Sequence, residues 1–296
     1  MADTQSVVFA QAYAANIMQL AQQKYSKLLP IVYMKPNVKG KTFFQDQIGQ
    51  WSMSTKGGRN VQTPNNDPNL ARRMGTMVDY HDNRMLDRGD ELRMISDPRS
   101  AYTIAAASAL GRQIDTVIAN AVYAVAKSGE TGSTDNTLGT TAIAAHLNPG
   151  GALVQGTAAT LTFARVRAAK RVLDLEDVEE EDRFFVVTPQ GLDALLNTTQ
   201  ATSSDYVTIK ALVRGDIDTW MGFKWIVSNQ LSSSGTVSGA FCMQRYGICL
   251  AMGAEPMVRT DERTDLSYSW QVYYELNIAA VRLEETRVCG VQLTSE

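Results

Sequence analysis

One short segment of the chain gathers most of the side chains that could do chemistry. Residues 80–94 read YHDNRMLDRGDELRM and place His81 among carboxylates, with Asp79 just before them. Carboxylates crowded together can hold Mg²⁺ or Ca²⁺, and a histidine beside them can act as a general acid or base. The segment therefore poses a choice between a hydrolytic site and a charged contact surface.

The arginines of the same segment favour the contact surface. Arg84, Arg88 and Arg93 are interleaved with the acids. Guanidinium groups compete for carboxylates and repel a metal cation, so a salt-bridged surface is the better interpretation. A carboxylate- or metal-dependent hydrolase that uses the Asp79 to Glu91 cluster stays open as an alternative of a different class.

No other pattern in the chain predicts catalysis or a cofactor. The only histidines, His81 and His146, lack the spacing of a zinc site, and Cys242, Cys249 and Cys289 form no CxxC pair. There is no GxSxG nucleophile elbow and no phosphate-binding loop followed by lysine. We therefore expect neither catalytic residues nor a metal or other cofactor.

The composition narrows the class of protein further. The chain has 296 residues and a formal net charge of -3, which argues against a broadly basic face that grips nucleic acid. Three unpaired cysteines are typical of a reducing compartment. The first residues are too polar for a secretory leader or a membrane span, so we expect a soluble protein made in the cytosol, with no membrane partner.

The first third of the sequence predicts a helix and a long hairpin. Residues 8–24 have the apolar spacing of an arm helix. Residues 41–54 and 72–97 are extended runs, and residues 54–69, rich in Gly, Pro and Asn, are an exposed tip between them. Such arms would reach on the order of 50 Å, and an isolated two-stranded ribbon is marginal in water. Something else must cover its apolar residues, which are Phe43, Phe44, Ile48, Trp51, Met74, Met77 and Val78.

Two helices are predicted in the middle of the chain. Asp97 as cap and Pro98 in the first turn start a long helix that continues to Gly129. Arg112, Gln113 and Asp115 are expected off the centre of its buried stripe, which comprises Ile104, Ala107, Ile114, Val117, Ile118, Ala121, Val122 and Val125. After a Gly- and Thr-rich loop at 129–159, residues 162–178 form a second helix. Its outward residues are expected to be Arg165, Arg167, Lys170 and Arg171.

The last third of the sequence alternates strands and turns. Residues 184–187 are a buried strand, after which Thr188 and Pro189 start a short helix. Residues 222–231 form another strand, and SYSWQVYYEL at 267–276 alternates strictly in the manner of a half-buried strand. The terminal run VCGVQL at 288–293 is expected to close the same sheet. The fold class is therefore α+β.

The order of these elements resembles one known family. The stretch GDELRMISDPRSAYTIAAASALGRQIDTVIANAV is similar to the end of the extended loop and the spine helix of tailed-bacteriophage major capsid proteins. RFFVVTPQGLDALL, GDIDTWMGFKWIVSNQL and AFCMQRYGICLAMG resemble the later parts of that Hong Kong 97-type fold, which encapsulin shells share. The resemblance implies an N-terminal arm at 1–35, an extended loop at 36–96, a spine helix and first peripheral part at 97–180, an axial domain at 181–245 and a return to the peripheral sheet at 246–296.

The same resemblance implies a structural role. The chain would self-assemble into hexamers and pentamers of an icosahedral virion shell around double-stranded DNA bound without sequence specificity, inside the host bacterial cytoplasm. A separate scaffolding protein, a portal and a decoration protein would be its partners, and an encapsulin-like compartment is the alternative. Some relatives cross-link through a loop lysine, but nothing near Lys56 indicates that it reacts. The candidate inter-subunit contacts are Phe43, Phe44, Trp51, Lys56, Arg59, Val78, Tyr80, Asp87, Arg88, Asp90 and Arg93.

Overall fold

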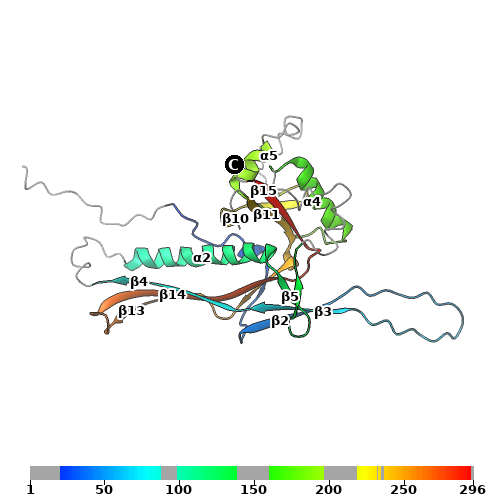
Figure 1. The fold of residues 1–296 in the computed structure, drawn as a ribbon, viewed down its shortest axis with the longest axis horizontal. Helices are drawn as coiled ribbons and strands as arrows, with labels where there is room; N and C mark the ends of the chain where they lie inside the picture. Colours follow the sequence, from blue (N-terminus) through cyan, green and yellow to red (C-terminus); the bar gives the residue numbers. More distant parts are fainter. Residues whose placement is uncertain are drawn as a thin grey trace, which may run out of the picture. The chain divides into compact units, whose positions relative to one another are not determined.

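The computed structural model describes residues 21–87, 99–138, 160–196, 219–231, 233–234 and 237–294. These residues form an α+β fold, as expected (Figure 1). Its elements in chain order are η2 (Leu29–Ile31), β1 (Tyr33–Lys35), β2 (Thr42–Ile48), β3 (Leu70–Thr76), β4 (Val78–Leu86), α2 (Arg99–Tyr123), β5 (Ala126–Ser128), β6 (Thr134–Asn136), α4 (Phe163–Leu175), β7 (Arg183–Val187), α5 (Pro189–Leu196), β8 (Thr219–Trp220), β9 (Phe223–Val227), β10 (Ser233–Ser234), β11 (Val237–Gln244), η4 (Arg245–Gly247), β12 (Ile248–Met252), β13 (Met257–Arg263), β14 (Ser269–Arg282) and β15 (Val288–Thr294).

The chain divides into two compact units. The smaller comprises Met1–Tyr25, Asp79–Arg112 and Pro256–Leu276, and the larger comprises Ser26–Val78, Gln113–Glu255 and Asn277–Glu296. Most of the predicted arm helix lies outside the described residues, and residues 21–24 are not helical. Helix α2 and strand β14 each contribute residues to both units.

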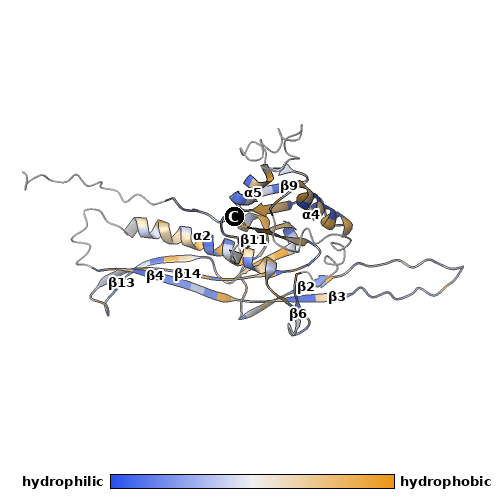
Figure 2. Ribbon diagram, turned by 45° about the horizontal axis from the view of Figure 1, so that its top comes forward, coloured by the Kyte–Doolittle hydropathy of each residue, from blue (hydrophilic) through white to orange (hydrophobic). Residues whose placement is uncertain are grey.

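A six-stranded sheet forms the main core of the larger unit. Its strands run in the order β10-β11-β7-β9-β8, and β15 pairs with β11. Strand β7 is buried along its whole length and pairs in parallel with β9, which fits its unbroken apolar run Phe184–Val187. Phe185 stacks on Trp225 with ring centroids 4.4 Å apart, and helix α4 packs against β15. Figure 2 shows hydrophobic colouring on this part of the chain, around α4 and β9.

The terminal strand β15 corrects the predicted sheet arrangement. Residues 288–293 were expected to complete the sheet that contains 267–276. Instead β15 runs antiparallel to β11 from Val237↔Thr294 to Met243↔Val288, whereas β14 pairs with β12, β13 and β4. Both runs have the same alternation of apolar residues, so the pattern by itself does not choose between partner strands.

The short helix α5 begins as the sequence predicts. Pro189 is its first residue, where the missing amide hydrogen costs nothing, and the backbone amide of Gly191 donates to Thr188 Oγ1 at 3.2 Å. The Thr-Pro pair therefore works as a helix start.

The smaller unit is built around one end of β14. Strand β13 pairs with it from Met257↔Glu275 to Arg263↔Ser269, and β4 also pairs with β14. The Tyr274 hydroxyl donates to Asp82 Oδ2 at 2.9 Å. Burial raises the pKa of Tyr274, and the hydrogen bond to the Asp82 carboxylate raises it further. The residues on β4 are mostly exposed.

The long helix ends earlier than the sequence predicts. Helix α2 stops at Tyr123, and residues 126–128 form strand β5 instead of continuing to Gly129. Ile104, Ala107 and Val125 are exposed, while Ile114, Ile118 and Val122 are buried as expected. Asp97 and Pro98, which were predicted to start this helix, lie outside the described residues.

Asp115 is the clearest error in the predicted helix face. It was placed off the centre of the buried stripe, but it is fully buried. Its carboxylate accepts hydrogen bonds from Ser26 Oγ at 2.5 Å and from the backbone amides of Lys27 and Leu28, both at 3.0 Å. The charge is tolerated because three donors replace its hydration shell. Asp115 thus fixes the start of η2 to helix α2.

Helix α4 also buries a charge that was expected to be outward. Arg165 is 6% exposed, and burial lowers its pKa. Val166, Ala169 and Leu173 are buried, and Arg167 and Arg171 are exposed as expected. Arg165 lies one residue before the apolar stripe, so its aliphatic stem can share that face.

We predict that Asp115→Ala lowers the free energy of unfolding of the unassembled subunit by about 3 kcal/mol, because two backbone amides lose a charged acceptor. Denaturant unfolding measures this value. Asp135→Ala is the matched control, since Asp135 makes an exposed ion pair with Lys127 at 2.5 Å and its loss should change little. Equal effects of the two substitutions would contradict the anchoring role of Asp115.

Candidate inter-subunit surface

A short two-stranded ribbon carries two of the predicted contact residues, Phe43 and Phe44, and the loop that joins its strands carries Trp51, Lys56 and Arg59. Strands β2 and β3 run antiparallel, from Thr42↔Thr76 to Ile48↔Leu70, and the Gly49 amide donates to the Asn69 carbonyl at 2.7 Å. Figure 1 shows the two strands side by side and continuing into a long loop. Residues 50–69 contain no helix or strand and are almost all exposed, so the predicted exposed tip is confirmed. The preceding strand ends at Ile48, six residues before the predicted boundary at Ser54.

The prediction that the second arm of the hairpin continues beyond Thr76 is wrong. Strand β3 pairs with β2 and β5, whereas the next strand, β4, pairs with β14. The chain switches partner at Met77, whose side chain is buried in a cluster with Phe43 and whose amide donates to the Lys41 carbonyl at 2.8 Å. The paired ribbon therefore spans about 23 Å and not 50 Å.

The inner face of the ribbon is covered by its own chain. The Phe43 ring is 4% exposed and packs in the cluster that includes Met77, Ala279 and Val281. A Cβ built on Gly75, directly opposite Phe43, would lie 2.2 Å from the ring, so only glycine leaves room for it. Phe43 therefore anchors the ribbon within its own subunit. The sequence had predicted it only as a contact between subunits.

A buried ion triad holds the base of the ribbon. The Arg73 guanidinium pairs with Glu285, and its Nε donates to the Leu283 carbonyl at 2.8 Å. On the other side of the same carboxylate, Arg282 Nε lies 3.6 Å from Glu285 Oε1. All three side chains are buried, and Arg282 is completely inaccessible. One carboxylate is thus shared by two buried cations, and burial lowers the pKa of Arg282.

Backbone carbonyls compensate the remaining positive charge. Arg282 donates through Nη1 to the carbonyls of Val122 at 2.6 Å and Ala124 at 3.1 Å, and through Nη2 to that of Asn136 at 2.9 Å. Val122 is in the last turn of α2, where carbonyls lack helical partners and the helix dipole is negative. Arg282 therefore joins the end of the long helix to the ion pair under the ribbon. The sequence reasoning missed this triad, because Arg73 lies 212 positions before Glu285.

An exposed ion pair lies on the outer face of the ribbon. Arg72 Nε approaches Asp46 Oδ1 at 2.5 Å, and the guanidinium carbon is 5.5 Å from the centre of the Phe44 ring. The hydrogen bond from Arg72 lowers the pKa of the Asp46 carboxyl and raises that of the guanidinium. Phe44 is half-buried, and its carbonyl accepts a hydrogen bond from Lys35 Nζ at 3.0 Å.

The end of the ribbon exposes a group of large apolar side chains. Ile48 and Leu70, directly opposite each other, are 74% and 72% exposed, and Trp51 and Met53 are 72% and 99% exposed. We call these four residues the apolar tip patch. Ile48 and Trp51 were named among the residues in need of cover, whereas Leu70 and Met53 were missed. The signal for Leu70 was its even spacing from Met74, which places the two on one face of β3.

The other predicted contact residues are dispersed. Lys56 and Arg59 are exposed in the loop, Val78 and Asp87 are exposed at and after β4, and Tyr80 is half-buried. Arg88, Asp90 and Arg93 lie outside the described residues.

His81 and its acidic neighbours lie on an exposed strand. Asp79, His81 and Asp82 are exposed on β4, and the Arg84 guanidinium lies 5.9 Å from the centre of the Tyr102 ring. Within the described ranges, no three His, Cys, Asp or Glu side chains are grouped as metal ligands. An exposed strand does not desolvate acids as hydrolytic sites do.

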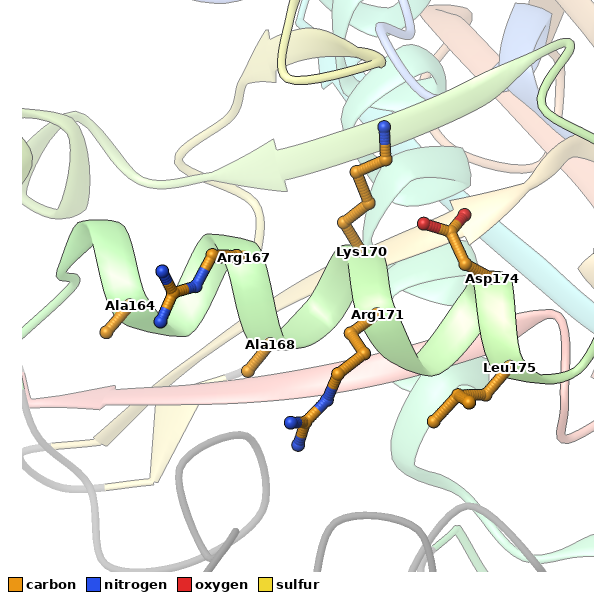
Figure 3. Close-up of a pocket in the computed structure, with 7 residues that line it drawn as sticks. All are labelled: Ala164, Arg167, Ala168, Lys170, Arg171, Asp174 and Leu175. Atoms are coloured by element: carbon orange, nitrogen blue, oxygen red, sulfur yellow. The ribbon is translucent and has the colours of Figure 1, made fainter.

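A basic hollow lies on the outer face of α4 (Figure 3). Its volume is about 540 Å³, and its lining residues are Ala164, Arg167, Ala168, Lys170, Arg171, Asp174 and Leu175. Among the described lining residues the one acid is Asp174, which pairs with Arg183. The cations Arg167, Lys170 and Arg171 give this surface the chemistry of an anion-binding contact.

Comparison with known proteins decides the class of this chain. A family model described as phage capsid protein matches residues 6–295. The chain belongs to the phage capsid protein family. The predictions of a major capsid protein, of a structural and non-enzymatic role and of a place in the virion capsid are thereby confirmed. The hydrolase alternative does not fit this family, and the family is a viral one, unlike the encapsulin alternative.

Solved capsid structures share the fold of this capsid protein. The capsid of Ralstonia phage GP4 has a TM-score of 0.71 at 14% identity, covering 97% of this chain and 95% of that one. The capsid of cyanophage P-SCSP1u has a TM-score of 0.70 at 16% identity, covering 98% and 94%. The capsid of Helicobacter pylori bacteriophage KHP30 has a TM-score of 0.71 at 9% identity, covering 100% and 98%. The predicted Hong Kong 97-type fold is confirmed for the chain as a whole, without its division into subdomains.

No curated protein sequence matches the chain. Among the described residues of this capsid protein, no helix has the length and apolar character needed to cross a bilayer.

We predict that Glu285→Gln lowers the free energy of unfolding of this capsid protein by about 3 to 5 kcal/mol, because two buried guanidinium groups lose the carboxylate that they share. Chemical unfolding of the unassembled subunit measures the loss. Asp46→Asn, in the exposed pair on the same ribbon, is the control and should leave the unfolding midpoint unchanged. A Glu285→Gln midpoint equal to that of the control would show that the triad does not hold the ribbon base.

Proposed function

We propose that this capsid protein builds an icosahedral shell of hexamers and pentamers around double-stranded DNA, and that its ribbon docks on a neighbouring copy. The observation that carries the docking proposal is the apolar tip patch on a ribbon whose base is locked. Large apolar side chains rarely stay exposed together on a surface that has no partner. A second copy supplies that cover at every position of a closed ring.

The energetics of the patch suit reversible assembly. Burying a large apolar side chain contributes about 1.5 to 3 kcal/mol. Two or three such residues give one weak contact per neighbour, and several neighbours together hold a subunit firmly. Weak single contacts allow misplaced subunits to leave during growth.

Exposed charges outside the paired strands of the ribbon set the register in this proposal. Arg59 and Lys56 in the loop and Asp87 after β4 are exposed, so they can meet opposite charges on a neighbour. Arg88, Asp90 and Arg93 keep their predicted role as contacts. Such rim charges contribute more to specificity and to association rate than to affinity.

The proposed division of the chain into structural parts keeps the boundaries predicted from the sequence, with one change. The arm comprises residues 1–35, the extended loop 36–96, the spine helix and first peripheral part 97–180, the axial domain 181–245 and the peripheral return 246–296. Because β15 pairs with β11, we place residues 288–294 with the axial strands. Scaffolding, portal and decoration proteins, and assembly in the bacterial cytoplasm, complete the proposal.

The net charge of -3 supports a container for DNA more than a tight DNA-binding protein. A strongly basic inner surface would hold the genome through many phosphate contacts. Negative-stain microscopy with the ratio of absorbance at 260 and 280 nm tests this part. Spherical particles with nucleic acid support a virion shell, and particles filled with protein would favour an enzyme compartment.

We predict that the double substitution Ile48→Ser and Leu70→Ser raises the concentration needed for assembly at least tenfold, because about 3 kcal/mol of apolar burial is lost per contact. Analytical sedimentation measures assembly, and calorimetry should show an unchanged melting temperature. Leu175→Ser, at an exposed apolar position on α4, is the control. Normal assembly of the double variant would refute docking through this patch.

Deletion of residues 56–69 tests the rest of the loop. We predict a folded subunit that forms few or fragile particles, since this segment is exposed and adds nothing to the core of its own subunit. Particle yield and resistance to heat, followed by sedimentation and microscopy, measure the effect. Particles as abundant and as robust as those of the intact chain would count against the loop.

A further inference from the structure

Two of the three cysteines face each other across neighbouring strands. Cys242 on β11 and Cys289 on β15 are directly paired in the antiparallel register, between Phe241↔Gly290 and Met243↔Val288. Both thiols are free, and neither side chain is more than 1% exposed. The third cysteine, Cys249, is on β12 in a different sheet and belongs to a different apolar cluster.

The distance between directly paired residues is close to what a disulfide needs. Opposed residues of an antiparallel pair have Cβ atoms about 4.5 to 5.5 Å apart, and a disulfide requires about 3.5 to 4.5 Å. The side chains of both cysteines join the same core cluster, so they point to the same side of the sheet. A hydrogen bond between the thiols and their burial raise the pKa of Cys289.

The surroundings hold the two strands in this register. The Tyr123 hydroxyl, at the end of α2, donates to the carbonyl of Ala240. A Cβ built on Gly290 would lie 2.7 Å from the Tyr123 ring, so the ring packs directly against the residue next to Cys289. A one-residue slip of β15 would move Cys289 to the other face and break this packing.

Strand β15 gives the buried thiols a route to reagents. Within the described sheet its strand partner is β11, so β15 lies at an edge of that sheet. Edge strands open locally at a lower free energy than the central strands of a core. Opening of β15 exposes both thiols at once, and closing brings them back face to face.

We propose that Cys242 and Cys289 form a redox-responsive pair that remains reduced in a reducing cytosol and closes to a cross-strand disulfide when a small-molecule disulfide oxidant is present. The thiolate of one cysteine attacks the oxidant, which forms a mixed disulfide and releases one small thiol. The thiolate of the other cysteine attacks the protein sulfur of that mixed disulfide and releases a second small thiol. Two protein thiols and one small disulfide thus become one protein disulfide and two small thiols.

The consequence of closure is a covalent clip on the last strand. Strand β15 would then no longer peel from β11 without breaking a bond, and the chain from 242 to 289 would become a closed loop. The change would matter for a shell that leaves a reducing cell, and only this biological setting rests on the proposed function. The chemistry itself belongs to the single subunit.

The test uses the purified full chain, treated with oxidised glutathione and then unfolded and alkylated. In the native chain, two of the three cysteines should escape alkylation, and peptide mass mapping should join the segments that contain Cys242 and Cys289. Cys249→Ala should behave in the same way, whereas Cys242→Ala and Cys289→Ala should form no internal disulfide. Oxidation should raise the melting temperature by about 5 °C in the native chain and in Cys249→Ala only.

Several results would overturn the proposal. These are three alkylated cysteines after oxidation, a mixed disulfide with glutathione that is not converted to an internal disulfide, or a disulfide that involves Cys249. Mapping of the native chain and of Cys249→Ala decides the matter even if the other two variants do not fold. The outcome is independent of shell formation, because the disulfide is measured in subunits whether or not they assemble.

Discussion

A single buried carboxylate is the constraint on which the ribbon and its surroundings depend. Glu285 lies between the guanidinium groups of Arg73 and Arg282. Arg73 comes from the ribbon, and Arg282 comes from the end of β14 and reaches the carbonyls that end α2. Desolvated charges are expensive unless every one of them is matched, so these segments must meet in one arrangement. The triad therefore works as a registry device more than as a source of stability.

This arrangement separates the part of the ribbon that stabilises the subunit from the part that is free for a neighbour. Phe43, Gly75 and Arg73 are committed to the interior, whereas the apolar tip patch is left uncovered. A ribbon held only by its own two strands would fray and lose the direction of its tip. A fixed base reduces the ordering cost of docking, which is how a small contact can be specific.

The same logic applies at two other polar contacts of helix α2. Asp115 ties the start of the described chain to α2, and Tyr123 ties the end of α2 to β11. Helix α2 thus has polar attachments in its second half, where its residues belong to the larger unit. The pale hydrophobic colouring of α2 in Figure 2 reflects its alanines, which give close packing but little direction by themselves. The polar contacts supply the direction.

Local patterns in the sequence were sufficient where a few neighbouring residues decide the outcome. The apolar run before Thr188 and Pro189 determined a buried strand and a helix start. The Gly-, Pro- and Asn-rich stretch at 54–69 determined an exposed loop, because it has too little apolar surface to pay for ordering. The order of such elements was also enough to predict the fold of the phage capsid protein family.

Only the tertiary structure decided which distant segments meet. Strand β3 and strand β4 are separated by one residue, yet they join different sheets, because Met77 is needed in the core. The placement of β15 beside β11, which opposes two cysteines, and the burial of Asp115, Arg165 and Arg282 were likewise invisible in local spacing. A charged residue is predicted to be exposed until its partner is known. The partners of Asp115 lie 87 to 89 positions away and those of Arg282 lie 146 to 160 positions away. Such partners are chosen by packing and by the need to match buried charge.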